Sequence, residues 1–212
     1  HTVVEPDNRF RDRDHHELYC LGHLLEAAIA YNKATGRDRF FRLMDKNVDH
    51  VIKRFTVDKD TGFLTPGHEE IELALCRAYE FTGDKKYLSL ASFFLDNRHL
   101  DHVPEDFWAN DFYFQSEAPV RELRSARGHC VRANYLYAGM ADVARYTNDR
   151  EMFNACKALF DDMAYGKMYI TGGIGSSRHN EGFEENFKLP NGDAYCETCA
   201  AIGMLFWAHR MN

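Results

Sequence analysis

Apolar residues recur at intervals of three and four along most of this chain, which is the spacing of an amphipathic helix. In the first such stretch, Leu18, Leu21 and Leu25 fall on one helical face. Gly36 follows, and glycine commonly ends a helix because it adopts the left-handed conformation at little steric cost. A second apolar run begins almost at once. The pattern therefore predicts two helices joined by a tight turn.

The same two-helix unit recurs twice more along the chain, and the first helix of a fourth unit begins near residue 194. Strand signals are weak throughout. We therefore predict an all-α protein built as an array of helical hairpins. The predicted helix pairs are 15–35 with 38–55, 67–82 with 84–98, and 127–147 with 149–165.

The three short turns share their chemistry, which strengthens the repeat. Gly36 and Gly83 supply the left-handed residue in two of them, and Asn148 supplies it in the third. One or two residues later each turn carries an aspartate, a side chain that caps helix N-termini well. These aspartates are Asp38, Asp84 and Asp149.

Long connections alternate with the short turns, at about 56–66, 99–120 and 166–193. Long ordered loops on one side of a helical array are usually functional. The first helix of each hairpin begins on this side, and a polar titratable residue stands near each start. If the array curves, these residues face a common mouth; they are His16, His68, His129 and Glu197.

Composition narrows the class of protein. The chain has 212 residues, enough for one domain over 1–212, with a formal net charge of −7. Excess negative charge argues against nucleic acid and anionic membranes as partners, and no apolar run approaches a membrane span. Four of the six cysteines are isolated in apolar segments, where we expect buried thiols in a reducing compartment, the cytoplasm; they are Cys20, Cys76, Cys130 and Cys156.

The candidate metal-binding and catalytic residues lie mostly near the end of the chain. Glu197 and Cys199 place a carboxylate and a thiol two positions apart, where a soft divalent metal such as zinc could take both. Two other interpretations stay open: a Cys196–Cys199 redox pair, and a first-turn glutamate beside a buried cysteine. Glu181 follows a glycine run and is the best-placed carboxyl to exchange a proton with an acetal oxygen. The aromatic residues within 107–114 could stack on sugar faces or pack as an apolar lid.

Several motifs, taken together and in order, resemble glycoside hydrolase family 127, the β-L-arabinofuranosidase family. The resemblance covers nearly the whole chain. The motifs are His16-Glu17-Leu18-Tyr19, Gly67-His68 with Glu70, Pro119-Val120-Arg121-Glu122, Gly128-His129 with Val131-Arg132, Thr171-Gly172-Gly173-Ile174-Gly175, and Glu197-Thr198-Cys199.

This resemblance implies an (α/α)6 barrel and retaining hydrolysis of a small carbohydrate or glycoside, with a zinc-bound cysteine as nucleophile. By alignment, Glu197 and Cys199 take the places of zinc ligands, and Glu181 takes the place of the general acid/base. The remaining matches imply substrate-binding residues at His16, His68 and His129.

The resemblance also implies two adjacent cysteines farther along, which complete the zinc site and include the nucleophile. The sequence contains no such pair. We therefore expect a fragment, with about three and a half hairpins and roughly half of the barrel, that is inactive alone. An open barrel edge would expose apolar helix faces and favour self-association.

Two other classes of function remain compatible with the pattern. One is a non-catalytic helical-repeat module that binds a protein partner on a concave surface. The other is a different (α/α)6 sugar-active enzyme, such as an epimerase or an unsaturated-uronide hydrolase. Neither of these needs the pairing of Glu197 with Cys199.

Overall fold

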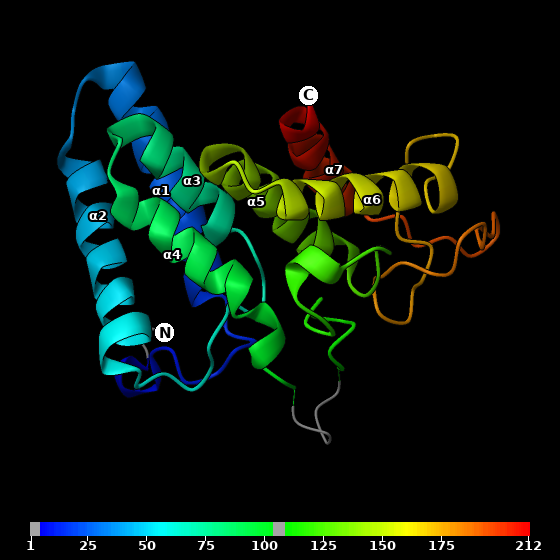
Figure 1. Ribbon diagram of the computed structural model, residues 1–212, viewed down its shortest axis with the longest axis horizontal. Helices are drawn as coiled ribbons and strands as arrows, with labels where there is room; N and C mark the ends of the chain where they lie inside the picture. The colour runs from blue at the N-terminus through cyan, green and yellow to red at the C-terminus, as the bar shows by residue number, and fades with distance from the viewer. Residues whose placement is uncertain (1–4, 104–108) are drawn as a thin grey trace. The chain divides into compact units, whose positions relative to one another are not determined.

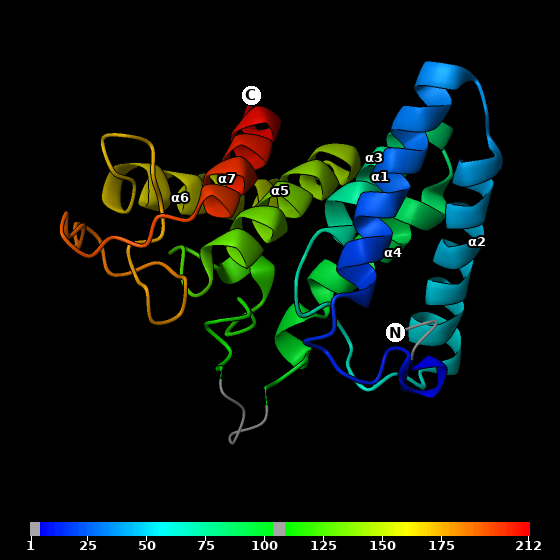
Figure 2. The ribbon, with the colours of Figure 1, turned by 180° about the vertical axis from the view of Figure 1, so that it is seen from behind.

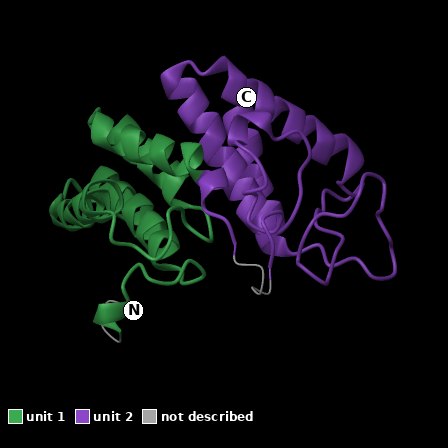
Figure 3. Ribbon diagram, turned by 60° about the horizontal axis from the view of Figure 1, so that its bottom comes forward, with its two compact units in different colours: residues 1–97 green, residues 98–212 purple. Residues whose placement is uncertain are grey.

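The computed structural model describes residues 5–103 and 109–212. Within these ranges it contains seven α-helices and no β-strand, which confirms the all-α class (Figure 1). The helices fold into two compact units, residues 1–97 and 98–212 (Figure 3). The prediction of a single domain over 1–212 stays a prediction.

Unit 1 consists of two helical hairpins. Helix α1 packs against α2 and α3, and α3 packs against α4, as Figures 1 and 2 show from opposite sides. The last turns of the second helix widen into a π-helical segment, Lys53–Asp58. Its Phe55 is buried, with its ring centroid 5.4 Å from that of Phe94. The four helices are α1 (Glu17–Thr35), α2 (Arg39–Ile52), α3 (Ile71–Thr82) and α4 (Lys85–Asp96).

Unit 2 contains the third hairpin, α5 (Cys130–Thr147) and α6 (Arg150–Gly166), and the predicted start of a fourth unit, α7 (Thr198–Met211). Helix α5 packs against both of the others. Trp207 of α7 is fully buried, with its ring 4.9 Å from Tyr137 of α5 and 5.1 Å from Phe160 of α6. One indole therefore ties three helices into a common core.

The turn chemistry is confirmed in all three hairpins. Gly36, Gly83 and Asn148 each follow the last residue of a helix with a positive φ, of 70°, 74° and 56° respectively. In each case the backbone N–H of this residue is bonded to a carbonyl of the preceding turn. The left-handed residue thus ends the first helix and reverses the chain.

The predicted aspartate caps are confirmed in two turns and wrong in one. Asp84 accepts a hydrogen bond from Lys86 N–H and Asp149 accepts one from Met152 N–H, both at 2.9 Å. Asp38 makes no capping bond because its own φ of −98° and ψ of −10° are already close to helical. Its carboxylate instead lies 3.2 Å from Arg42, one turn along α2.

The cysteines largely follow expectation. None of the six, all in described positions, forms a disulfide. Cys76, Cys130 and Cys156 are buried as predicted, but Cys20 is exposed, so its predicted burial is wrong. None of the helices in the described ranges is long and apolar enough to span a membrane.

The aromatic stretch is only partly described, because Phe107 and Trp108 lie outside the described residues. Tyr113 and Phe114 are buried. The guanidinium of Arg132 lies 5.1 Å from the ring centroid of Tyr113 and 5.0 Å from that of Phe114. This part of the stretch therefore packs inside unit 2.

Candidate active site

His129 is the N-cap of α5 and is buried. Its Nδ1 accepts hydrogen bonds from the backbone N–H groups of Val131 at 3.2 Å and Arg132 at 3.4 Å. A ring nitrogen that accepts carries no proton, so in the neutral ring the proton is on Nε2. Burial lowers the pKa of His129 and the Arg132 charge lowers it further, against the opposing effect of Glu181. The neutral ring is therefore favoured, with its N–H pointing away from the helix.

The Nε2–H of His129 points at the side chain of Glu181. His129 Nε2 donates to Glu181 Oε2 at 3.1 Å, and the hydroxyl of Tyr195 donates to Oε1 at 2.8 Å. Both oxygens of this half-exposed carboxylate thus receive a hydrogen bond from the protein. The same contact, together with burial, raises the pKa of Tyr195 to about 12, so Tyr195 keeps its proton near neutral pH.

The backbone around Glu181 is held in an unusual conformation. Its φ is +52°, in the left-handed region that non-glycine residues seldom adopt. Its carbonyl accepts a bond from Cys130 N–H at 3.0 Å, and the next residue, Gly182, is bridged to Ser177 by two backbone hydrogen bonds. Because these bonds hold both sides of the residue, the loop directs the Glu181 side chain toward His129.

Glu197 is the N-cap residue of α7 and joins the same cluster. One ligand atom from each of His129, Glu181 and Glu197 lies within 4.8 Å of the others. Oε2 of Glu197 is buried and receives no hydrogen bond from the described residues. Hydrogen bonding to Glu197 raises the pKa of the Cys199 thiol, and burial adds to this effect. The predicted pair therefore does lie together.

The donor set fits a soft metal at Glu197 and Cys199. A buried carboxylate oxygen without a donor is costly unless a cation or a proton satisfies it. A thiol two residues along, in contact with that carboxylate, supplies the second ligand type that zinc prefers. Both nitrogens of His129 are already engaged, so His129 belongs to the hydrogen-bond cluster and not to the ligand pair.

The glycine run explains where Cys196 points. A Cβ on Gly173 would lie 3.3 Å from the Cys196 sulfur, and one on Gly175 would lie 2.7 Å from the Cys130 sulfur. Glycine at 175, where φ is +83°, thus allows the loop to lie against the start of α5. Cys196 packs on this loop whereas Cys199 contacts Glu197, so the two thiols have different surroundings. This arrangement does not favour the redox interpretation.

The other two predicted histidines lie in unit 1 and form a cluster of their own. His16 is at the N-cap position of α1, and His68 stands two residues before the N-cap of α3. Their ring centroids are 5.5 Å apart, and the Tyr19 ring packs beside both, with its centroid 5.5 Å from that of His16 and 4.5 Å from that of His68. The sequence did not single out Tyr19, although the quoted motif ends on it.

Both histidines of this cluster are oriented by backbone carbonyls. Nδ1 of His16 lies 2.9 Å from Asp14 O, and Nδ1 of His68 lies 2.8 Å from Glu69 O. A carbonyl oxygen only accepts, so Nδ1 carries the proton in each ring. In the neutral ring Nε2 is then an acceptor, which is the opposite of the arrangement at His129.

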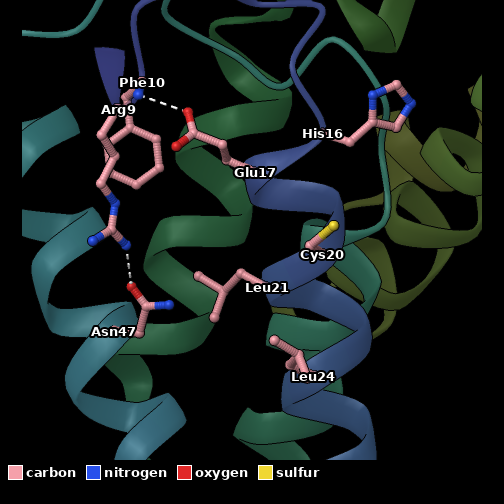
Figure 4. A pocket seen from close by; sticks show the side chains of 8 residues that line it. All are labelled: Arg9, Phe10, His16, Glu17, Cys20, Leu21, Leu24 and Asn47. Carbon is pink, nitrogen blue, oxygen red and sulfur yellow. Dashed lines mark hydrogen bonds between the residues drawn. The ribbon is translucent and has the colours of Figure 1, made fainter. Parts of the chain in front are cut away.

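A cavity of about 380 Å³ lies along one side of α1 and includes His16 in its lining (Figure 4). Glu17 accepts a bond from Phe10 N–H at 2.6 Å, and Arg9 donates to Asn47 at 2.7 Å. Figure 4 shows the His16 ring extending away from this group of side chains. Four of the eight lining residues therefore bond the N-terminal segment to α1 and α2.

Unit 1 also contains a second group of potential ligand atoms, which the sequence did not reveal. One ligand atom from each of His23, Glu26 and Glu70 lies within 4.8 Å of the others. Glu70 is buried, and its Oε1 is 3.3 Å from His23 Nδ1. Burial lowers the pKa of His23. No sequence motif connects this group with the zinc prediction, which concerns unit 2.

Comparison with known proteins identifies the family of the chain. The model of the β-L-arabinofuranosidase GH127 catalytic domain matches residues 2–212. The chain belongs to glycoside hydrolase family 127. A crystal structure of a GH127 β-L-arabinofuranosidase from Geobacillus stearothermophilus T6 superposes on 98% of the chain with a TM-score of 0.91 and 42% identity.

Two further similar proteins agree with this assignment. A GH127 β-arabinofuranosidase structure covers 92% of the chain at 43% identity, with a TM-score of 0.84. The non-reducing end β-L-arabinofuranosidase of Bifidobacterium longum subsp. longum is 35% identical over 92% of the chain. The chain spans 35%, 30% and 32% of these three proteins, so it corresponds to about a third of their length.

Proposed function

We propose that this chain is part of the catalytic domain of a retaining glycosidase that cleaves L-arabinofuranosidic linkages. The observation that carries the proposal is the Glu181 carboxylate, half exposed and held by His129 and Tyr195 beside Glu197. Membership of family 127, with relatives named as β-L-arabinofuranosidases, supports the substrate class.

In this proposal Glu181 is the general acid/base. As the acid it gives a proton to the glycosidic oxygen as the sugar departs, and as the base it removes a proton from the incoming water. The hydrogen bonds from His129 and Tyr195 fix the plane of the carboxyl group. Each carboxyl oxygen has a second lone-pair direction, so these bonds leave room for the transferred proton.

Glu197 and Cys199 are the proposed zinc ligands of this chain. These two side chains would hold the ion, which when bound would stabilise thiolate near neutral pH. The two further cysteine ligands implied by the family, one of them the nucleophile, have no counterpart among the six cysteines of the sequence. We therefore propose that they come from outside these 212 residues and that the chain alone does not hydrolyse glycosides.

His16 and His68 are the proposed sugar contacts of unit 1. Their Nε2 atoms are acceptors in the neutral ring, which suits them to receive hydrogen bonds from sugar hydroxyl groups. His129 is the third proposed sugar contact and lies in unit 2, where its Nε2–H is directed at Glu181. We therefore propose that His129 both contacts the sugar and donates a hydrogen bond to the acid/base Glu181.

The decisive experiment uses a protein that contains these 212 residues together with the paired cysteines. It should release L-arabinose from an aryl β-L-arabinofuranoside, and Glu181→Gln should lower kcat by about 10²- to 10⁴-fold. Wild-type hydrolysis by Glu181→Gln would contradict the assignment of Glu181. Arabinose release by the 212-residue chain alone would contradict the proposal that the nucleophile lies elsewhere.

The same assays separate the other classes of function. Full activity in Cys199→Ala, on a different sugar, would favour another (α/α)6 enzyme such as an epimerase or an unsaturated-uronide hydrolase. Tight binding to a protein partner that does not depend on zinc would favour a helical-repeat binding module.

A further inference from the structure

Tyr195 lies in the loop just before α7, outside the residues that the family motifs single out. Its hydroxyl is 2.8 Å from Oε1 of Glu181. The backbone beside it is anchored, because Cys196 N–H donates to Gly175 O at 2.8 Å. The tyrosine ring is therefore presented to Glu181 from a loop that is itself tied to the glycine run.

Glu181 needs such a contact because its own side chain is long and half exposed. His129 holds only one of the two carboxylate oxygens, Oε2. A single hydrogen bond leaves the carboxylate free to turn about that contact and into solvent. A second donor on Oε1 fixes the carboxylate plane, since the two bonds reach different oxygens.

We propose that Tyr195 is a positioning residue for the acid/base Glu181, an assignment that rests on the proposed function. Its hydroxyl holds the Glu181 carboxylate against His129 Nε2–H and keeps that carboxylate turned toward Glu197. His129 in turn is fixed by its capping bonds to α5. Tyr195 thus acts through Glu181 and takes no direct part in bond making or breaking.

The structural arm of the test uses the 212-residue chain itself, labelled with ¹⁵N-histidine. In the wild type the His129 Nε2–H should give an observable NMR signal that exchanges slowly with water. Tyr195→Phe removes only the hydroxyl, so the carboxylate leaves His129 more often and exchange should quicken by about tenfold or more. Thermal unfolding of each variant separates this effect from loss of folding.

Tyr169→Phe is the matched control. It removes a hydroxyl from the same long loop, where Tyr169 donates to Pro190 O at 2.9 Å; among the described residues the hydrogen bonds to the Glu181 carboxylate come from His129 and Tyr195. Exchange of the His129 proton should stay at the wild-type rate in this variant. Wild-type exchange in Tyr195→Phe, or equal acceleration in both variants, would overturn the proposal.

The kinetic arm uses the protein that carries the paired cysteines. Tyr195→Phe should lower kcat by about tenfold and leave KM within about twofold, because orientation of Glu181 matters most in the transition state. An unchanged kcat would overturn the positioning role. Failure of the proposed function would be recognised separately, because the Glu181→Gln variant would then hydrolyse the substrate as fast as the wild type.

Discussion

The histidines of the two units look alike in sequence and differ in chemistry. In unit 1, His16 and His68 donate from Nδ1 to backbone carbonyls, which leaves Nε2 as an acceptor. In unit 2, His129 accepts at Nδ1 from the start of α5 and donates from Nε2 to Glu181. The first arrangement suits sugar hydroxyl groups and the second suits a carboxylate. Whether the side chain of such a histidine caps its helix thus decides which ring nitrogen carries the proton, and therefore which partner the other nitrogen can bind.

The proposed metal ligands of unit 2, Glu197 and Cys199, give the largest expected effect. Glu197→Ala or Cys199→Ala removes a side chain proposed to touch the ion. Either should weaken zinc binding by more than the roughly 10–100-fold that is lost with a residue that only hydrogen-bonds to a ligand. Cys196→Ser should retain the affinity, because Cys196 packs on Gly173. Isothermal titration with Zn²⁺ measures all three variants. Equal losses in Cys196→Ser and Cys199→Ala would contradict the assignment of the ligands.

Alanine substitutions test the difference between the histidines directly. His129→Ala removes the cap of α5 and should cost about 1–2 kcal/mol of stability, with the loss of the Glu181 contact added to it. His16→Ala should change stability by less than about 0.5 kcal/mol, because the His16 side chain makes no capping bond. Urea denaturation monitored by circular dichroism compares the two. Equal losses would show that capping does not distinguish them.

The buried imidazole of His129 also predicts how stability depends on pH. Its pKa is lowered below 6.5 in the folded protein, so the unfolded chain binds more protons at mildly acidic pH. The contribution is fully present above pH 6.5 and is lost as the pH falls below it. His129→Asn keeps a capping side chain without a titrating group and should flatten this slope. Part of the slope should remain, because burial also lowers the pKa of His23 and His50 in unit 1.

The aspartates of the three hairpin turns give the smallest expected differences in the free energy of unfolding. Asp149→Ala removes a cap and an ion pair with Arg121 at 2.8 Å, and should cost about 1 kcal/mol or slightly more. Asp84→Ala removes only a cap and should cost about 1 kcal/mol or less. Asp38→Ala should cost less than about 0.5 kcal/mol, because its one ion pair is exposed. A large loss in Asp38→Ala would mean that this aspartate contributes in a way its contacts do not account for.

Much of the fold could be predicted from local pattern. The period of three and four predicts each of the seven α-helices found in residues 5–103 and 109–212, because burying one face of a helix requires that spacing. Helix starts differ more from the pattern, which predicts the third helix from residue 67, whereas α3 begins at Ile71. Cys20 was expected to be buried and is exposed, since an apolar context along the chain does not fix which helix face meets a neighbour.

The candidate site could be predicted only in part. Motifs singled out Glu181 and Glu197, and the structure brings them together with His129. Tyr195 was missed, because no spacing rule links a loop tyrosine to a carboxylate in another part of the loop. Its role depends on the conformation of residues 171–182, which is set by backbone bonds between distant positions.

The sequence by itself determined the helical hairpins, their turns and the residue types of the candidate centre, because these follow from local periodicity, backbone preference and side-chain chemistry. Only the tertiary structure decided which ring nitrogen of each histidine carries the proton and which donors hold Glu181. The bonds that place the ring protons are close in sequence, such as His68 Nδ1 to Glu69 O, but they require backbone angles that bring donor and acceptor to about 3 Å, within a few tenths of an ångström. The two donors to Glu181 lie 52 and 14 residues away along the chain. Such distances are fixed by packing, and no local pattern encodes them.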